Sequence, residues 1–119
     1  MVKKEDWKTT DMPKENTTFE IELSLTEENK KYLQEGYLPT CMEDKWFIYY
    51  ENNKYYFHRS WTGYCIYILE EIDNNKYKVT VSRNKEEYLG EDIEQEKELL
   101  LRLINHYARI KEGTYIWKH

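Results

Sequence analysis

The segment over residues 45–63 constrains the fold of this chain more than any other part of it. It reads KWFIYYENNKYYFHRSWTG, with two aromatic-rich runs on either side of residues 52–53. Asn accepts the left-handed backbone of a two-residue type I′ turn, so the segment is predicted to be a β-hairpin. Such a turn fixes the register of the two strands and predicts that Trp46 faces Arg59.

This register divides the side chains of the hairpin between its two faces. One face carries Trp46, Ile48, Tyr50, Tyr55, Phe57 and Arg59. The other face carries Phe47, Tyr49, Tyr56, His58 and Ser60. Because both faces are aromatic, we expect the hairpin to lie centrally in a sheet, with helix covering one face and a groove along the other.

Further elements are predicted on both sides of this hairpin. Period-two alternation indicates a strand over residues 18–25. Thr26 is a suitable N-cap for a helix over residues 27–35, and Gly36 is a suitable residue to end it. Residues 1–17 are polar and patternless, which predicts a flexible arm that Trp7 could anchor.

A second hairpin is predicted from Tyr64 to Arg83, with its turn at residues 73–76. Its core face is expected to carry Ile66, Ile68, Ile72, Tyr77, Val79 and Val81. A helix capped by Asp92 and Gln95 should follow and end near residues 111–113, and residues 114–117 could add an edge strand.

These elements predict an α+β domain over residues 18–119, preceded by the arm. Its antiparallel sheet should have four or five strands built from two central hairpins. A short N-terminal helix and a long C-terminal helix should pack mainly on one face.

Composition narrows the functional classes. A net charge of −5 argues against non-specific binding to nucleic acid, which needs a basic surface. The sequence contains no apolar run long enough for a membrane span and no secretory signal at its start, so a cytoplasmic protein is expected. Cys41 and Cys65 form no CxxC motif and lack histidines at zinc spacing, so neither a metal nor a cofactor is expected.

The candidate ligand site is the segment at the end of the second strand of the first hairpin. Arg59 is one of four arginines in the chain, and a guanidinium suits bidentate binding of phosphate or carboxylate. The expected ligand-binding residues are Trp46, Tyr50, His58, Arg59, Ser60, Trp61 and Thr62. The structural alternative is that Arg59 stacks on Trp46 and pairs with a carboxylate.

Catalytic residues cannot be assigned from these patterns. Ser60 and His58 lie two residues apart on a strand, where side chains share a face but seldom hydrogen-bond. The sequence has no GxSxG elbow, P-loop, GxGxxG or HExxH motif. Binding is therefore expected rather than catalysis.

The runs KWFIYYE and YFHRSWTGYCIY resemble a signature of small bacterial and phage-type proteins, over about a sixth of the chain. Similar segments accompany ADP-ribose-related domains and phage-conflict genes, so the resemblance implies a nucleotide-derived ligand.

The sequence therefore predicts a binding module for a small anionic, nucleotide- or ADP-ribose-like molecule, which could sequester a signalling nucleotide. One alternative is an immunity or inhibitor protein that contacts a protein partner. Another is a small hydrolase of a nucleotide-derived ligand. Homo-oligomerisation stays open.

Overall fold

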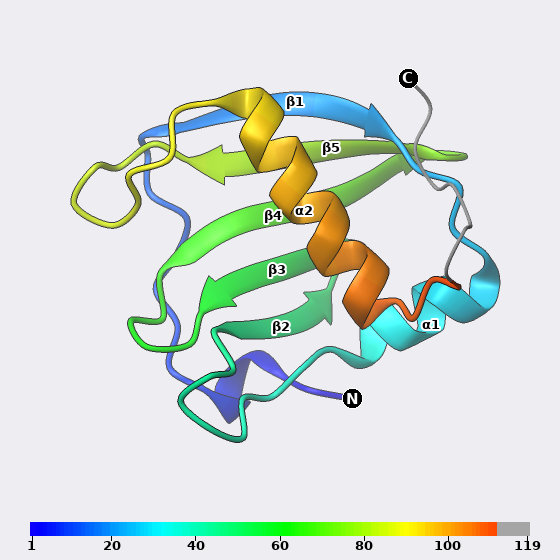
Figure 1. The fold of residues 1–119 in the computed structure, drawn as a ribbon, viewed down its shortest axis with the longest axis horizontal. Helices are drawn as coiled ribbons and strands as arrows, with labels where there is room; N and C mark the ends of the chain where they lie inside the picture. Colours follow the sequence, from blue (N-terminus) through cyan, green and yellow to red (C-terminus); the bar gives the residue numbers. More distant parts are fainter. Residues whose placement is uncertain (112–119) are drawn as a thin grey trace.

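Five antiparallel strands in the order β1-β5-β4-β3-β2 form the centre of the computed structural model, which describes residues 1–111 (Figure 1). The strands are β1 (Asn16–Glu22), β2 (Trp46–Glu51), β3 (Lys54–Arg59), β4 (Cys65–Asp73) and β5 (Lys76–Ser82). The helices are η1 (Lys4–Asp6, 3₁₀), α1 (Glu27–Glu35) and α2 (Ile93–Tyr107). This arrangement confirms the predicted α+β class.

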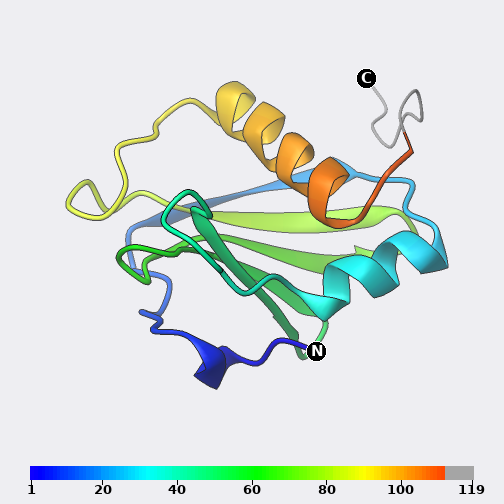
Figure 2. The same cartoon turned by 60° about the horizontal axis from the view of Figure 1, so that its bottom comes forward.

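Helix α2 crosses one face of the sheet diagonally (Figures 1 and 2). Its residues Leu100 and Ile104 are fully buried there, as the apolar spacing of the helix predicts. They belong to one hydrophobic core with residues of the sheet that include Phe57, Tyr67, Leu69, Tyr77, Val79 and Val81. The helix ends at Tyr107, earlier than expected, and Arg109 then takes a left-handed φ of 55°. The possible strand over residues 114–117 lies outside the described residues.

Helix α1 has the bounds that the sequence predicts. The Thr26 hydroxyl accepts the backbone N–H of Asn29 at 3.0 Å, and Gly36 ends the helix with a φ of 79°. Leu33 is fully buried, and the Lys30 ammonium lies 2.9 Å from the Glu71 carboxylate of β4. These contacts place α1 at one end of the sheet.

The β2–β3 hairpin has the predicted register. Trp46 pairs with Arg59 and Glu51 with Lys54, and both turn residues take left-handed φ values, 53° and 64°. The hairpin lies at one side of the sheet rather than in its middle, because β2 is an edge strand. A short bridge between Ile48 and Tyr37 covers part of that edge.

The core face predicted for the second hairpin is wrong in part. Two bulges in β4 change which of its side chains point inward. Ile66 is the extra residue at the first bulge and is fully buried. Ile72 is the extra residue at the second bulge and is 51% exposed. Between them, Ile68 pairs with Thr80 on the opposite face, so Tyr67 and Leu69 take the core positions.

Residues 1–15 pack along the face opposite α2, beside β2 and β3 (Figure 2). The Trp7 ring stacks on Phe47 with centroids 6.4 Å apart, and its Nε1–H donates to the Ser60 carbonyl at 2.8 Å. The Thr10 backbone N–H donates to the Gly63 carbonyl at 2.8 Å. Trp7 thus contacts the hairpin, the possibility that the sequence left open beside a flexible arm, and β1 begins at Asn16, inside the predicted arm of residues 1–17.

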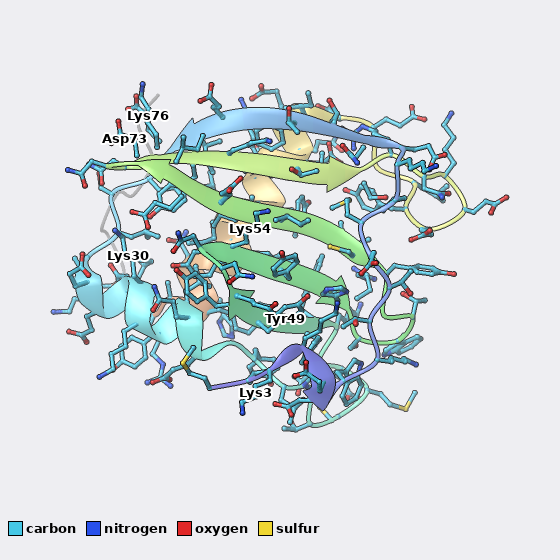
Figure 3. All side chains as sticks on the ribbon, turned by 180° about the vertical axis from the view of Figure 1, so that it is seen from behind. Lys3, Lys30, Tyr49, Lys54, Asp73 and Lys76 are labelled. Atoms are coloured by element: carbon cyan, nitrogen blue, oxygen red, sulfur yellow. The ribbon has the colours of Figure 1, made fainter. Side chains whose placement is uncertain are left out.

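Charged side chains cover much of the rest of this face (Figure 3). Strand register aligns one residue from each strand in a row of alternating charge: Glu20, Lys78, Glu70, Lys54 and Glu51. Opposite charges therefore face each other at every step across the sheet, which favours this register.

Candidate ligand-binding site

Arg59 ends strand β3 with its side chain on the α2 side of the sheet. Its guanidinium carbon lies 5.3 Å from the centre of the Trp46 ring, and Trp46 itself is 7% exposed. Arg59 is exposed, and among residues 1–111 it makes no ion pair with a carboxylate. The structural alternative is therefore correct for the stacking of Arg59 on Trp46 but not for a carboxylate pair, and Arg59 remains exposed to solvent.

A hollow of about 280 Å³ adjoins Arg59. Its lining consists of Lys45, Arg59, Trp61, Thr62 and Glu87. Two cationic side chains and one carboxylate thus line the same hollow. Its volume is close to that of the smallest pockets that bind small molecules. An anion would meet Lys45 and Arg59, and a donor group on the same molecule would meet Glu87.

The turn after β3 holds Trp61 and Thr62 in place. The backbone N–H of Gly63 donates to the Arg59 carbonyl at 2.8 Å, and the Arg59 N–H donates to the Tyr64 carbonyl at 2.9 Å. Trp61 is 62% exposed, yet its Nε1–H donates to the Met42 carbonyl at 2.9 Å. The indole is therefore an oriented, solvent-facing plane suited to stacking.

Ser60 faces away from Arg59 and has a structural contact. Its hydroxyl donates to the Asp44 carbonyl at 2.6 Å, and the residue is 3% exposed. The Asp44 carboxylate accepts the Thr40 backbone N–H at 2.9 Å, and this bond, with the Tyr37 and Thr40 hydroxyls, lowers the Asp44 pKa to about 2. Ser60 therefore joins the turn to the loop before β2 and has no free hydroxyl for the Arg59 hollow.

His58 does not belong to the Arg59 hollow, because adjacent residues of a strand point to opposite faces. It is 2% exposed and lies among Phe47, Tyr49 and Tyr56 on the arm side. Burial lowers the pKa of its imidazole, which favours the neutral ring.

Tyr50 lies near the other end of the hairpin. Four residues of strand separate it from Trp46, about 13 Å at the usual rise. Its hydroxyl donates to the Asn53 side chain at 3.2 Å, and its ring packs on Tyr55. Of the seven predicted residues, the structure thus brings together Arg59, Trp61 and Thr62, with Trp46 beneath them.

Sequence reasoning missed two residues of this hollow. Lys45 directly precedes β2, and the pairing of Trp46 with Arg59 could have placed it at the same end of the hairpin. Glu87 comes from the loop between β5 and α2, which carries no periodic pattern. One oxygen of its carboxylate accepts the Asn84 amide at 3.3 Å, while the other is buried without a partner among the described residues.

A second hollow, of about 700 Å³, lies on the arm side of Trp61. Its lining consists of Trp7, Lys8, Pro39, Thr40, Cys41, Met42, Ser60 and Trp61. Among residues 1–111, Trp61 alone lines both hollows, so its indole separates an Arg59 side from a more apolar side.

The fold defines a small α+β protein with an antiparallel sheet, and the hollow beside Arg59 is its candidate site. Comparison with known proteins finds no matching family model, curated protein or solved structure. None of the helices within residues 1–111 has the length and apolar character needed to cross a membrane.

Proposed function

We propose that this protein binds a small anionic molecule of the nucleotide class in the hollow beside Arg59. The observation that supports this most is the exposed guanidinium stacked on Trp46, with no carboxylate partner among the described residues. A cation held on a ring and left unneutralised is well placed to bind phosphate.

The other side chains of the hollow suit the rest of such a ligand. Trp61 offers an oriented ring on which a base could stack, and Lys45 adds a second positive charge. Glu87 also lines the hollow, and its carboxylate could accept an N–H or O–H from a base or a sugar. We include ADP-ribose among the candidate ligands because the runs KWFIYYE and YFHRSWTGYCIY suggest a resemblance to proteins linked with it.

Binding is tested by the melting temperature of the protein with AMP, ADP, ADP-ribose or inorganic phosphate. A ligand at 100 times its Kd should stabilise the fold by about 2.7 kcal/mol. Arg59→Ala should abolish this stabilisation. Arg102→Ala, which removes the same charge from an exposed position on α2, should retain it. Absence of a shift with every nucleotide, or an equal loss in both variants, contradicts the proposal.

A protein-interaction module is the second candidate. It is favoured by Trp61 and Met42, which are 62% and 72% exposed on the rim of the larger hollow. Exposed aromatic and methionine side chains are enriched in protein interfaces. A protein that co-purifies with the wild type but not with Met42→Ala, without any nucleotide effect, would select this function.

A hydrolase receives less support. The sequence suggested His58 as the general acid or base of a hydrolase. Its side chain lies on the face opposite Arg59. Incubation with the stabilising nucleotide, followed by chromatography for products, separates retention from hydrolysis. Retention without turnover is the result expected for a protein that sequesters its ligand.

A further inference from the structure

The arm and the buried His58 ring share one hydrogen-bond acceptor. The Gly63 carbonyl oxygen accepts the Thr10 backbone N–H at 2.8 Å, and His58 Nδ1 lies 2.8 Å from the same oxygen. A carbonyl oxygen can only accept a hydrogen bond, so Nδ1 carries the proton of the neutral ring. The attachment of the arm at Thr10 and the orientation of the imidazole therefore depend on the same carbonyl.

The second ring nitrogen of His58 has no partner. Nε2 is buried and makes no hydrogen bond to any described residue. A cavity of about 110 Å³ lies beside the ring, and its lining includes Lys4, Asp11 and Met12 of the arm. A proton added at Nε2 would create a charged donor without an acceptor beneath the arm, and burying such a charge is costly.

The charged groups around His58 do not offset this cost. The ionisable groups that line the cavity with it are Lys4 and Asp11 on the arm, Tyr49 and Glu51 on β2, Tyr56 on β3 and Cys65 on β4. Within residues 1–111, no carboxylate forms an ion pair with the imidazole. The Asp11 carboxylate lies 3.8 Å from the Lys4 ammonium instead, and its side chain is 94% exposed. Burial and the Lys4 charge lower the pKa of His58 by more than the Gly63 carbonyl and Asp11 raise it.

We propose that the arm is a pH-responsive cover, which leaves the β2–β3 face when His58 takes up a proton. Once the arm lifts away, water reaches the ring and can stabilise the imidazolium. The open state then binds a proton that the closed state excludes, so acid shifts the equilibrium towards opening. The shift begins as the pH falls below 6.5, the ordinary pKa of a histidine, and is absent above it.

The arm is suited to open while the sheet stays folded. Among the described residues, residues 1–14 make three hydrogen bonds to the rest of the protein, from Val2 to Glu35, from Trp7 to Ser60 and from Thr10 to Gly63. Strand β3, in contrast, pairs with β2 on one side and with β4 on the other. Segments with few attachments open at the lowest free energy. Acid would thus expose the aromatic rings that surround His58 without unfolding the domain.

Hydrogen exchange of the full chain between pH 8 and pH 5 tests this proposal, with each rate corrected for the intrinsic pH dependence of exchange. The Thr10 amide reports on the arm, and the Leu23 amide, which donates to the Asn75 carbonyl at 2.9 Å, reports on the sheet. Below pH 6.5, protection of Thr10 should fall by up to about tenfold per pH unit, while Leu23 stays the better protected of the two. Constant protection of Thr10, or equal protection of both amides throughout, overturns the proposal.

Variants assign the response to His58. His58→Phe should abolish the pH dependence at Thr10, whereas His106→Gln, at an exposed position of α2, should retain it. A dependence that persists in folded His58→Phe protein overturns the proposal.

Trp7→Ala gives a second measure that leaves the imidazole in place. It removes the contacts of Trp7 with Phe47 and Ser60, so the arm should open more readily. Because the coupling between arm and proton is reciprocal, the midpoint of the His58 titration followed by NMR should then rise towards 6.5. The same midpoint in wild type and Trp7→Ala overturns the proposal.

Discussion

The Arg59 guanidinium lies over the Trp46 ring, 5.3 Å from its centre, and joins the two strands of the aromatic hairpin at their open end. The two partners differ sharply in burial, because Trp46 is 7% exposed whereas Arg59 is exposed. The ring belongs to the core, while the charge it supports faces the hollow. Their substitution should therefore have very different effects on stability.

Arg59→Ala should lower the free energy of unfolding by only about 0.5–1 kcal/mol, the usual worth of an exposed cation–π contact. Trp46→Ala should cost about 3–5 kcal/mol, because it leaves a cavity beside Tyr67. Urea denaturation of both variants measures the difference. Equal losses would show that Arg59 is a structural residue rather than a ligand-binding one.

Stability should fall as the pH drops through the range of histidine titration. The pKa of His58 is lowered from 6.5 in the folded protein by burial, so the unfolded chain binds a proton that the folded chain does not. The free energy of unfolding is then greatest above pH 6.5 and decreases below it, by up to about 1.4 kcal/mol per pH unit. Denaturant titrations between pH 8 and pH 5 measure this slope.

Two variants isolate the contribution of His58. His58→Phe should flatten the dependence, whereas His106→Gln, at an exposed position of α2, should leave it as in the wild type. A slope that survives in His58→Phe would assign the effect to another group. The lowered pKa of Asp44 acts in a separate window, with its stabilisation lost as the pH falls from about 4 towards 2.

Glu96→Gln should destabilise the protein strongly. Glu96 is 3% exposed and accepts two bonds from Arg83, at 2.7 and 2.5 Å, so the pair joins α2 to the end of β5. Removing its charge leaves the Arg83 guanidinium unpaired, at a cost of about 3 kcal/mol. Chemical denaturation measures the loss, with Glu98→Gln at an exposed position of the same helix as the control. Similar results for both variants would contradict the structural role of the pair.

Gly63→Ala should loosen the attachment of the arm. Gly63 has a φ of 81°, and a Cβ placed there would lie 2.9 Å from the Lys8 carbonyl oxygen. The left-handed backbone alone costs a residue with a Cβ about 1–2 kcal/mol. We expect faster hydrogen exchange at the Thr10 amide, which donates to Gly63. Unchanged protection of that amide would contradict this prediction.

The sequence was most informative where local geometry leaves few choices. The two-residue turn at residues 52–53 determined which side chains of the first hairpin share a face. It follows that Arg59 lies on the same face as Trp46, whereas His58 lies on the opposite face. Alternation alone failed in β4, because each bulge inserts one residue and exchanges the faces beyond it. Nothing in the pattern of Ile66, Ile68 and Ile72 marks the bulge positions.

The candidate site was predictable only in part, for a similar reason. Arg59, Trp61 and Thr62 are close together in sequence, so a single turn keeps them together in space. Glu87 comes from a distant loop, and only the folded chain brings it to the hollow. Tyr50 was included on the basis of its shared face, although the length of the strand separates it from Arg59.

The stacking of Trp7 on Phe47 makes the first fifteen residues a structural layer rather than an appendage. A shortened protein that began at β1 would present the Phe47, Tyr49 and His58 rings to water as one aromatic surface. Exposed patches of this kind promote association between molecules. Such a truncated protein should therefore aggregate while its strands and helices remain intact, and experiments on the hairpin surface need the full N-terminal segment.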